Sequence, residues 1–110
     1  MKNEVNKRRV TIRIAPFYKR ALEHYAIDSD STITDIIVRL ITEQVQNKTV
    51  YSDKERVVPQ GETMSEFLAF NVDMKLYKEF RHYCVDIRAR PERLLNQMIY
   101  FMLKESGSND

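Results

Sequence analysis

Hydrophobic and polar residues alternate along Val10–Ile14 (VTIRI), with β-branched side chains at most positions. A period of two is typical of a strand with one buried and one exposed face. The even-numbered residues are expected to face a core. Arg9, Thr11 and Arg13 are then expected to point outwards together.

The period then changes to that of a helix. Pro16 stands where the first turn of a helix tolerates proline. One face of the segment that follows is apolar and carries Tyr18, Ala21, Leu22, Tyr25 and Ala26. The polar residues 28–31 interrupt the pattern, and Thr32 with Asp35 resembles a capping box. A second helix is predicted from there to about Gln46. Its apolar stripe is formed by Ile33, Ile36, Ile37, Leu40, Ile41 and Val45.

The same succession recurs 58 positions later in the chain. Leu22–Asp28 (LEHYAID) corresponds to Phe80–Asp86 (FRHYCVD), and the flanking apolar positions stay in phase without gaps. The aligned pairs include Ile12 with Phe70, Ile14 with Val72, Ile36 with Leu94, Ile37 with Leu95, and Ile41 with Ile99. The chain therefore consists of two copies of a unit of about 35 to 40 residues.

The second copy predicts the same elements as the first. They are a strand at 67–72, a helix at 74–85, a break at 87–90, and a helix from Pro91 to about Lys104. Between the copies, residues 47–65 are polar and contain the turn signal Pro59–Gly61. We interpret them as a linker with a short extended piece at Val57–Val58. Residues 105–110 are expected to form a flexible tail.

One short strand and two helices cannot bury their own apolar face. Two such units can, by pairing their strands and interlocking four helices. The predicted fold is thus mainly α with a short antiparallel β-ribbon, its two units forming an intramolecular pseudo-dimer. The expected parts are a basic N-terminal arm (1–8), a first unit (9–46), the linker, a second unit (66–104) and the tail. A linker of about 20 residues can reach roughly 60 Å, so it also permits strands to pair between chains.

The formal net charge of +2 is unevenly distributed. Residues 1–20 hold seven basic side chains and one acidic side chain, whereas the rest of the chain holds eleven basic and fifteen acidic ones. A basic end on a mildly acidic body favours contact with a polyanion. A solubilising tail would have the same composition.

Other classes of protein are disfavoured. No apolar run approaches the roughly 18 residues that span a bilayer. The first nine residues also contain no apolar stretch as long as that of a signal peptide. The single cysteine, Cys84, allows neither an internal disulfide nor a cysteine-based zinc site, and it aligns with the expected core residue Ala26. His24 and His82 share a repeat position without carboxylate or cysteine partners, so they are expected to have structural or solvent-facing roles. We expect no metal, no cofactor, no membrane contact and no enzymatic activity, in a cytoplasmic protein.

Three motifs follow one another in the first copy: RVTIRIAP at 9–16, the apolar pairs at 21–22 and 25–26, and TITDII at 32–37. In this order they resemble the ribbon-helix-helix family of DNA-binding proteins, which includes the Arc and MetJ repressors. The resemblance covers almost all of 8–46 and 66–104. Single-chain tandem forms of the family occur among plasmid-transfer accessory factors and viral regulators, so the resemblance fits a prokaryotic protein encoded by a plasmid or a virus.

The resemblance implies that the two strands form a ribbon in the major groove of DNA. The residues expected to contact bases are Arg9, Thr11, Arg13, Ala69 and Asn71. Phe67, the remaining outward residue of the second strand, is expected to pack against the linker or a neighbouring chain. The first strand is basic and is expected to determine most of the sequence specificity, whereas the second, which has no outward cation, is expected to contribute less. This difference predicts an asymmetric half-site.

The resemblance also implies that the second helix of each unit holds a phosphate at its start, where backbone N–H groups attract anions. The residues expected to contact phosphates are Lys7, Arg8, Thr32, Thr34, Arg88, Arg90 and Arg93. The arginines of the second copy could instead form surface ion pairs with Asp86 and Glu92.

The last helix is apolar around most of its circumference, although a helix covered on one side needs only a stripe. The extra apolar surface indicates either a deeper core or an oligomer contact. Self-association is expected through Leu95, Met98, Tyr100, Phe101 and Met102.

The expected function is sequence-specific binding of double-stranded DNA, as a transcriptional repressor or regulator or as an accessory factor of plasmid transfer (the relaxosome). Antitoxins of the family usually carry a long C-terminal extension, and six residues after Lys104 do not supply one. The alternative is a protein-interaction module that kept the fold and lost DNA binding.

Overall fold

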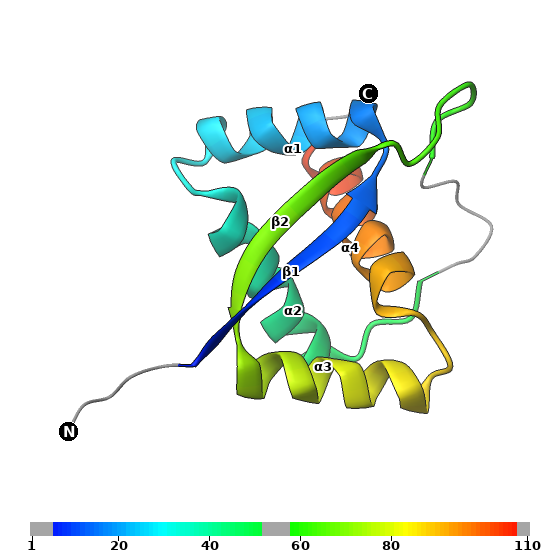
Figure 1. Ribbon diagram of the computed structural model, residues 1–110. Helices are drawn as coiled ribbons and strands as arrows, with labels where there is room; N and C mark the ends of the chain where they lie inside the picture. Colours follow the sequence, from blue (N-terminus) through cyan, green and yellow to red (C-terminus); the bar gives the residue numbers. More distant parts are fainter. Residues whose placement is uncertain (1–5, 52–57, 108–110) are drawn as a thin grey trace.

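A computed structural model describes residues 6–51 and 58–107 of the chain. The elements follow in the order β1 (Lys7–Ile14), α1 (Pro16–Asp28), α2 (Ile33–Asn47), β2 (Glu66–Asp73), α3 (Met74–Asp86) and α4 (Pro91–Ser106) (Figure 1). Within these residues the structure is mainly helical, with four helices and one two-stranded antiparallel sheet. The predicted mainly α fold with a short β-ribbon is confirmed.

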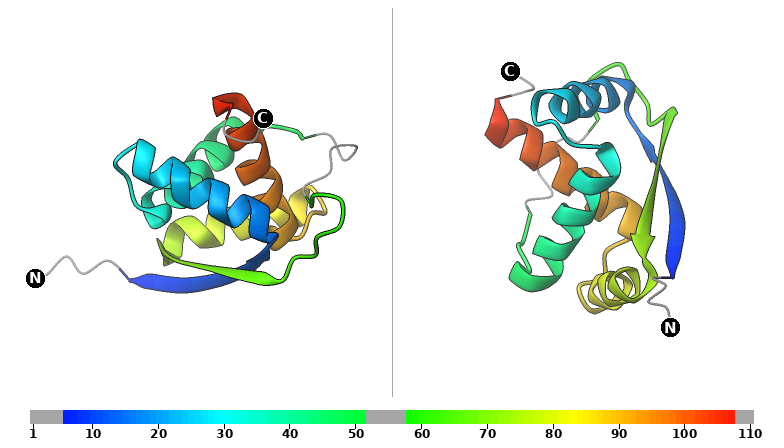
Figure 2. Two further views of the ribbon diagram at one scale, coloured as in Figure 1. Left: turned by 90° about the horizontal axis from the view of Figure 1, so that it is seen from above. Right: turned by 90° about the vertical axis from the view of Figure 1, so that its left-hand side faces the viewer.

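The two strands pair along their whole length within the chain, from Lys7 opposite Asp73 to Ile14 opposite Glu66. Burial alternates along β1 as the sequence pattern predicts, because its even-numbered residues from Val10 to Ile14 are buried. All four helices lie on one side of the ribbon and leave its other face uncovered (Figure 2).

The helices of the two halves interlock behind the ribbon. α2 packs against α3 of the other half, α4 packs against α1, and α2 also contacts α4. α1 and α3 lie at the two ends of the ribbon (Figure 1). Phe70, Phe80, Leu22 and Leu95 are fully buried in the single core that results.

The turn between the helices has the same backbone in both halves. Asp30 and Arg88, which are 58 positions apart, adopt left-handed conformations with φ of 54° and 61°. The N–H of Ser31 donates to Ala26 O and the N–H of Ala89 donates to Cys84 O, both at 2.9 Å. This bond closes a left-handed helix end of the Schellman type, so the chain turns from the first helix into the second with the same local backbone geometry in both halves.

The part of the connection that precedes β2 is anchored to the first half of the chain. Near β2, the N–H of Glu62 donates to Pro59 O at 3.1 Å, and Gly61 has a φ of 88°, which confirms the predicted turn. The carboxylate of Glu62 then accepts the N–H of Phe17 at 3.1 Å. It thus caps α1, whose N-cap residue Ala15 has no side chain that could do so.

Several predicted boundaries shift. Lys7 and Arg8 belong to β1 rather than to an arm, because the ladder continues through them to Asp73 and Val72. α4 continues to Ser106, so residues 105 and 106 are helical. Of the expected extended piece, Val57 lies outside the described residues and Val58 is not in a strand. Residues 1–5 and 108–110 of the expected arm and tail also lie outside the described part of the chain.

Candidate nucleic-acid interface

The uncovered face of the ribbon carries three cross-strand pairs of side chains. The pairs are Arg9 with Asn71, Thr11 with Ala69, and Arg13 with Phe67. Ala69 is half-buried and the other five side chains are exposed. All residues predicted to contact bases therefore share one face, together with Phe67.

The register distributes the arginines over both ends of this face. Thr11 and Ala69 are equivalent in the repeat and lie opposite each other at its centre. Because the strands are antiparallel, Arg9 lies towards one end of the ribbon and Arg13 towards the other. Both arginines of this face come from β1, as the sequence requires, and β2 contributes no basic residue to it. Each end of the face nevertheless carries one arginine.

Arg13 is held by the start of α4. Its backbone N–H donates to Glu92 Oε2 at 2.7 Å, and its guanidinium Nη2 lies 3.3 Å from Glu92 Oε1. The Arg13 side chain remains 60% exposed. The buried Asn96 ties the same two segments together, because its Nδ2 donates to Arg13 O and to Glu92 O, both at 3.0 Å.

The bond from the Arg13 backbone lowers the pKa of Glu92 below its ordinary value of 4.5. Burial opposes this shift, while the Arg13 guanidinium and the charge of Arg90 add to it. Glu92 therefore remains ionised at neutral pH, as a fixed negative charge beside one edge of the ribbon.

Arg9 has neither an ion pair nor a hydrogen bond to a side chain among residues 6–51 and 58–107. Arg8 points to the other side of β1, where its guanidinium carbon lies 5.5 Å from the centre of the Tyr77 ring in α3. Of the three arginines of β1, Arg9 is thus the one whose charge is most available on the outward face.

The starts of α2 and α4 flank the ribbon on opposite sides (Figure 1). At α2, Thr32 Oγ1 accepts the N–H of Asp35 at 3.0 Å, which confirms the predicted cap, and Thr34 is half-buried. At α4, the N-cap residue Arg90 makes no side-chain cap bond.

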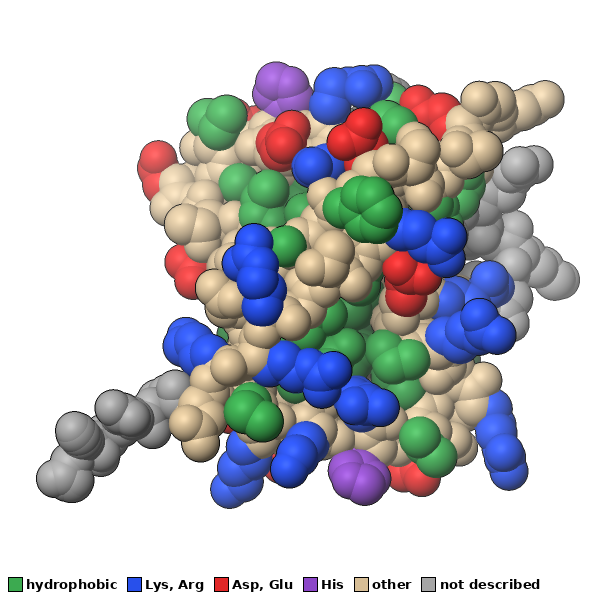
Figure 3. All heavy atoms as spheres, viewed as in Figure 1, with side chains coloured by type: hydrophobic (Ala, Val, Ile, Leu, Met, Phe, Trp, Pro, Cys, Tyr) green, Lys and Arg blue, Asp and Glu red, His purple; other side chains and the backbone are tan. Residues whose placement is uncertain are grey.

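The residues expected to hold phosphate at α4 are all exposed: they are Arg88, Arg90 and Arg93. Lys and Arg side chains cover much of the lower part of the ribbon face and the region beside the start of α4 (Figure 3). The basic residues of β1 and those that precede and begin α4 thus lie on the same side of the molecule.

The surface predicted for self-association is largely internal. Leu95 and Met98 are buried in the core of the chain, so the prediction that they contact another copy is wrong. Tyr100 packs edge-on against Tyr18, and Phe101 stacks on Tyr51 with 5.1 Å between ring centres. Met102 is half-buried. The extra apolar surface of α4 is explained by this deeper core.

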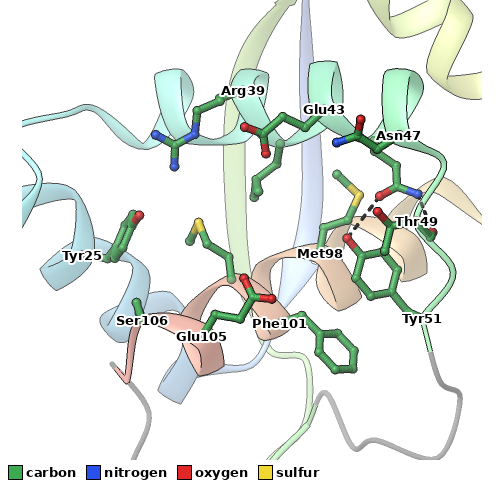
Figure 4. A pocket seen from close by; sticks show the side chains of 13 residues that line it. Tyr25, Arg39, Glu43, Asn47, Thr49, Tyr51, Met98, Phe101, Glu105 and Ser106 are labelled. Carbon is green, nitrogen blue, oxygen red and sulfur yellow. Dashed lines mark hydrogen bonds between the residues drawn. The ribbon is translucent and has the colours of Figure 1, made fainter.

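A cavity of about 560 Å³ lies between α2 and α4, on the side of these helices away from the ribbon (Figure 4). Its rim includes Arg39, Glu43 and Glu105. At one end, the buried Gln44 donates from Nε2 to Thr49 O at 2.8 Å and accepts from Tyr51 Oη at 3.1 Å. Gln44 Nε2 also lies 3.2 Å from Tyr83 Oη.

Three polar residues that the hydrophobic pattern does not single out align with apolar residues of the other copy. Asn96 aligns with Val38, Gln44 with Met102, and Ala15 with Asp73. A polar residue in one copy where the other is apolar marks a position whose surroundings differ between the halves. Glu92, which aligns with Thr34, carries no such signal because both are polar.

No described helix is long and apolar enough to cross a membrane. The described residues include no group of three or more His, Cys, Asp or Glu side chains arranged to hold a metal ion. Both histidines are exposed, Cys84 is buried as predicted, and burial raises the pKa of its thiol to about 11. No protein-family model, curated protein or solved structure was found to match the chain.

Proposed function

We propose that this protein binds double-stranded DNA sequence-specifically, with its β-ribbon in the major groove, as members of the ribbon-helix-helix family do. Its role would be that of a transcriptional repressor or regulator, or of an accessory factor in plasmid transfer. The observation that carries the proposal is the uncovered ribbon face, on which Arg9, Thr11, Arg13 and Asn71 lie together, opposite the inner face whose apolar residues from Val10 to Ile14 and from Leu68 to Val72 are buried.

The chemistry of this face suits base recognition. A major groove about 12 Å wide admits a two-stranded ribbon, and arginine and asparagine side chains can bond the edges of guanine and adenine bidentately. Arg9 and Asn71 face each other across the strands, so in the proposed complex they would reach neighbouring base pairs. Phosphates on either side would meet the start of α2 at one edge and the arginines near the start of α4 at the other.

The proposal includes a pseudo-dimer of ribbon-helix-helix units within one chain. Three observations support it: repeat-equivalent residues pair at the centre of the ribbon, the inter-helix turns share one backbone geometry, and each second helix packs against the first helix of the other half. An approximate two-fold axis through Thr11 and Ala69 would produce all three.

Fluorescence anisotropy with a random-sequence duplex, titrated at increasing salt, tests the proposal. We expect the logarithm of affinity to fall linearly with the logarithm of salt, with a slope of about −0.9 for each phosphate contacted. The double variant Arg9→Ala/Arg13→Ala should lose affinity, because it removes two cations from the face that is proposed to enter the groove. Arg39→Ala, which removes one charge from the cavity side, is the matched control and should behave like wild type.

Absence of binding at low salt would reject the proposal, as would equal effects of the ribbon and control variants. An interaction module without DNA binding is the second candidate, and the exposed Phe67 is the observation that favours it. That candidate predicts no salt-dependent affinity for duplex DNA.

A further inference from the structure

Phe67 is the one large apolar side chain on the outward face of the ribbon. It is 61% exposed, and it lies opposite Arg13. The prediction that it packs against the linker is not met within the described residues, since most of its ring remains accessible. The free energy of an aromatic ring falls when the ring leaves water. This position therefore favours a partner with an apolar surface.

The position of Phe67 in the ribbon indicates which chemical group of a DNA partner it would contact. Phe67 is equivalent in the repeat to Arg9, so the two lie towards opposite ends of the same face. If Arg9 reaches base edges at one end, Phe67 reaches the corresponding base pair at the other. The apolar group that DNA offers in the major groove is the 5-methyl group of thymine.

The neighbour of Phe67 adds to the difference between the ends. Arg13 lies opposite Phe67, but its guanidinium bonds sideways to Glu92 at the start of α4. At the other end, Arg9 and Asn71 lie opposite each other and can both donate hydrogen bonds. One end therefore carries two hydrogen-bonding side chains, whereas the other carries an apolar ring beside a single guanidinium that is also paired with Glu92.

We propose that Phe67 recognises the 5-methyl group of a thymine, so that the DNA site carries this thymine in one half and is not palindromic. This inference rests on the proposed DNA binding. A methyl group makes no hydrogen bonds, so the hydrogen-bonding side chains beside Phe67 cannot recognise it.

The test uses a duplex selected from a random library by the full-length protein. Each thymine of the selected site is replaced in turn by uracil, which removes only the methyl group. Affinities of wild type and Phe67→Ala are then measured by anisotropy. We expect uracil at one position, or at two adjacent ones, to weaken wild-type binding about four-fold, the value for one methyl-sized group. Phe67→Ala should bind both duplexes equally.

Ile27→Ala is the matched control, since Ile27 is another exposed apolar residue, at the end of α1. It should keep the wild-type preference for thymine. Far-UV circular dichroism should show that Phe67→Ala is folded, because Phe67 lies outside the core.

The remaining outcomes separate the two levels of the inference. Tight binding that is insensitive to every uracil replacement overturns the role of Phe67 and leaves DNA binding intact. A wild-type protein that binds no duplex overturns the proposed function itself. If Phe67→Ala keeps the thymine preference but lowers the mass measured by light scattering, Phe67 contacts a second copy and the proposal is wrong.

Discussion

The carboxylate of Glu92 has opposite effects on the fold and on the proposed DNA complex. It accepts the backbone N–H of Arg13 at 2.7 Å and pairs with the Arg13 guanidinium, which stabilises the junction of β1 and α4. It also places a negative charge beside the arginines proposed to hold phosphate. Replacing it is therefore expected to destabilise the protein and to strengthen binding to DNA of any sequence.

The magnitude follows from the geometry. A hydrogen bond to a charged group contributes about 1.5–3 kcal/mol, and an exposed ion pair adds less than about 1 kcal/mol. The Glu92 side chain is 35% exposed, so solvent screening favours the lower values. We expect Glu92→Ala to lower the free energy of unfolding by about 2 kcal/mol. Glu92→Gln keeps an acceptor and should lower it by about 1 kcal/mol.

The loss should depend on pH in a defined direction. The pKa of Glu92 is lower in the folded protein than in the unfolded chain, chiefly because of the bond from the Arg13 backbone. The carboxylate therefore stabilises the fold fully at pH values above its ordinary pKa of 4.5, which applies in the unfolded chain. This contribution disappears as the pH falls through the lower, folded pKa. The difference between wild type and Glu92→Gln should accordingly be full at pH 7 and shrink below about pH 4.

Urea unfolding followed by circular dichroism measures the stability, and anisotropy with random duplex DNA measures the affinity. Removing the charge should strengthen binding by up to about eight-fold at 0.1 M salt, since one charge corresponds to a salt slope of about 0.9. Glu79→Gln, an exposed acid on α3, is the control. Unchanged stability of Glu92→Gln at pH 7 would refute the role of the backbone bond. Weaker DNA binding would refute the placement of the start of α4 at the phosphates.

Three further predictions concern single positions. Gln44→Met introduces the residue found at the equivalent position 102 and removes three hydrogen bonds, so it should lower the free energy of unfolding by about 2–3 kcal/mol; a variant as stable as wild type in urea would contradict the network. Phe70→Ala, at a fully buried site, should lower the free energy of unfolding by about 3–5 kcal/mol. Phe67→Ala, on the opposite face of the same strand, should change it by less than about 0.5 kcal/mol. Similar losses in thermal unfolding would show that the faces of β2 are misassigned. Arg90→Ala should weaken binding to selected and random duplexes equally and make the salt slope shallower by about 0.9. Anisotropy measures both quantities. A loss of affinity that depends on the DNA sequence would contradict a phosphate contact.

The helices and strands were predictable from the sequence because their signals are local. The period-two pattern of β1, Pro16 and Pro91 at helix starts, and the Thr32 cap each act within a few residues of the element that they define. The repeat then identified the second copy from the first. The outward residues of the ribbon followed from strand alternation alone.

The contacts that complete the candidate site could not be predicted in this way. Glu92 and Arg13 are 79 positions apart, and Glu62 caps a helix 45 positions earlier. Such pairs depend on how the two halves interlock and on the path of the connection between them, which no local period encodes. The same reasoning explains the error for α4: its excess apolar surface is covered by Tyr18 and Tyr51, which lie far from it in sequence.

Amide chemical shifts recorded by NMR during titration with a selected DNA duplex test the central claim most directly, because they show which residues meet the DNA. The proposed binding mode predicts the largest changes at residues 9–13 and 67–71 and at the starts of α2 and α4. Little change is expected around the cavity near Tyr25 and Glu43. Changes concentrated at the cavity face, or none in the ribbon, would contradict the claim that the ribbon binds DNA.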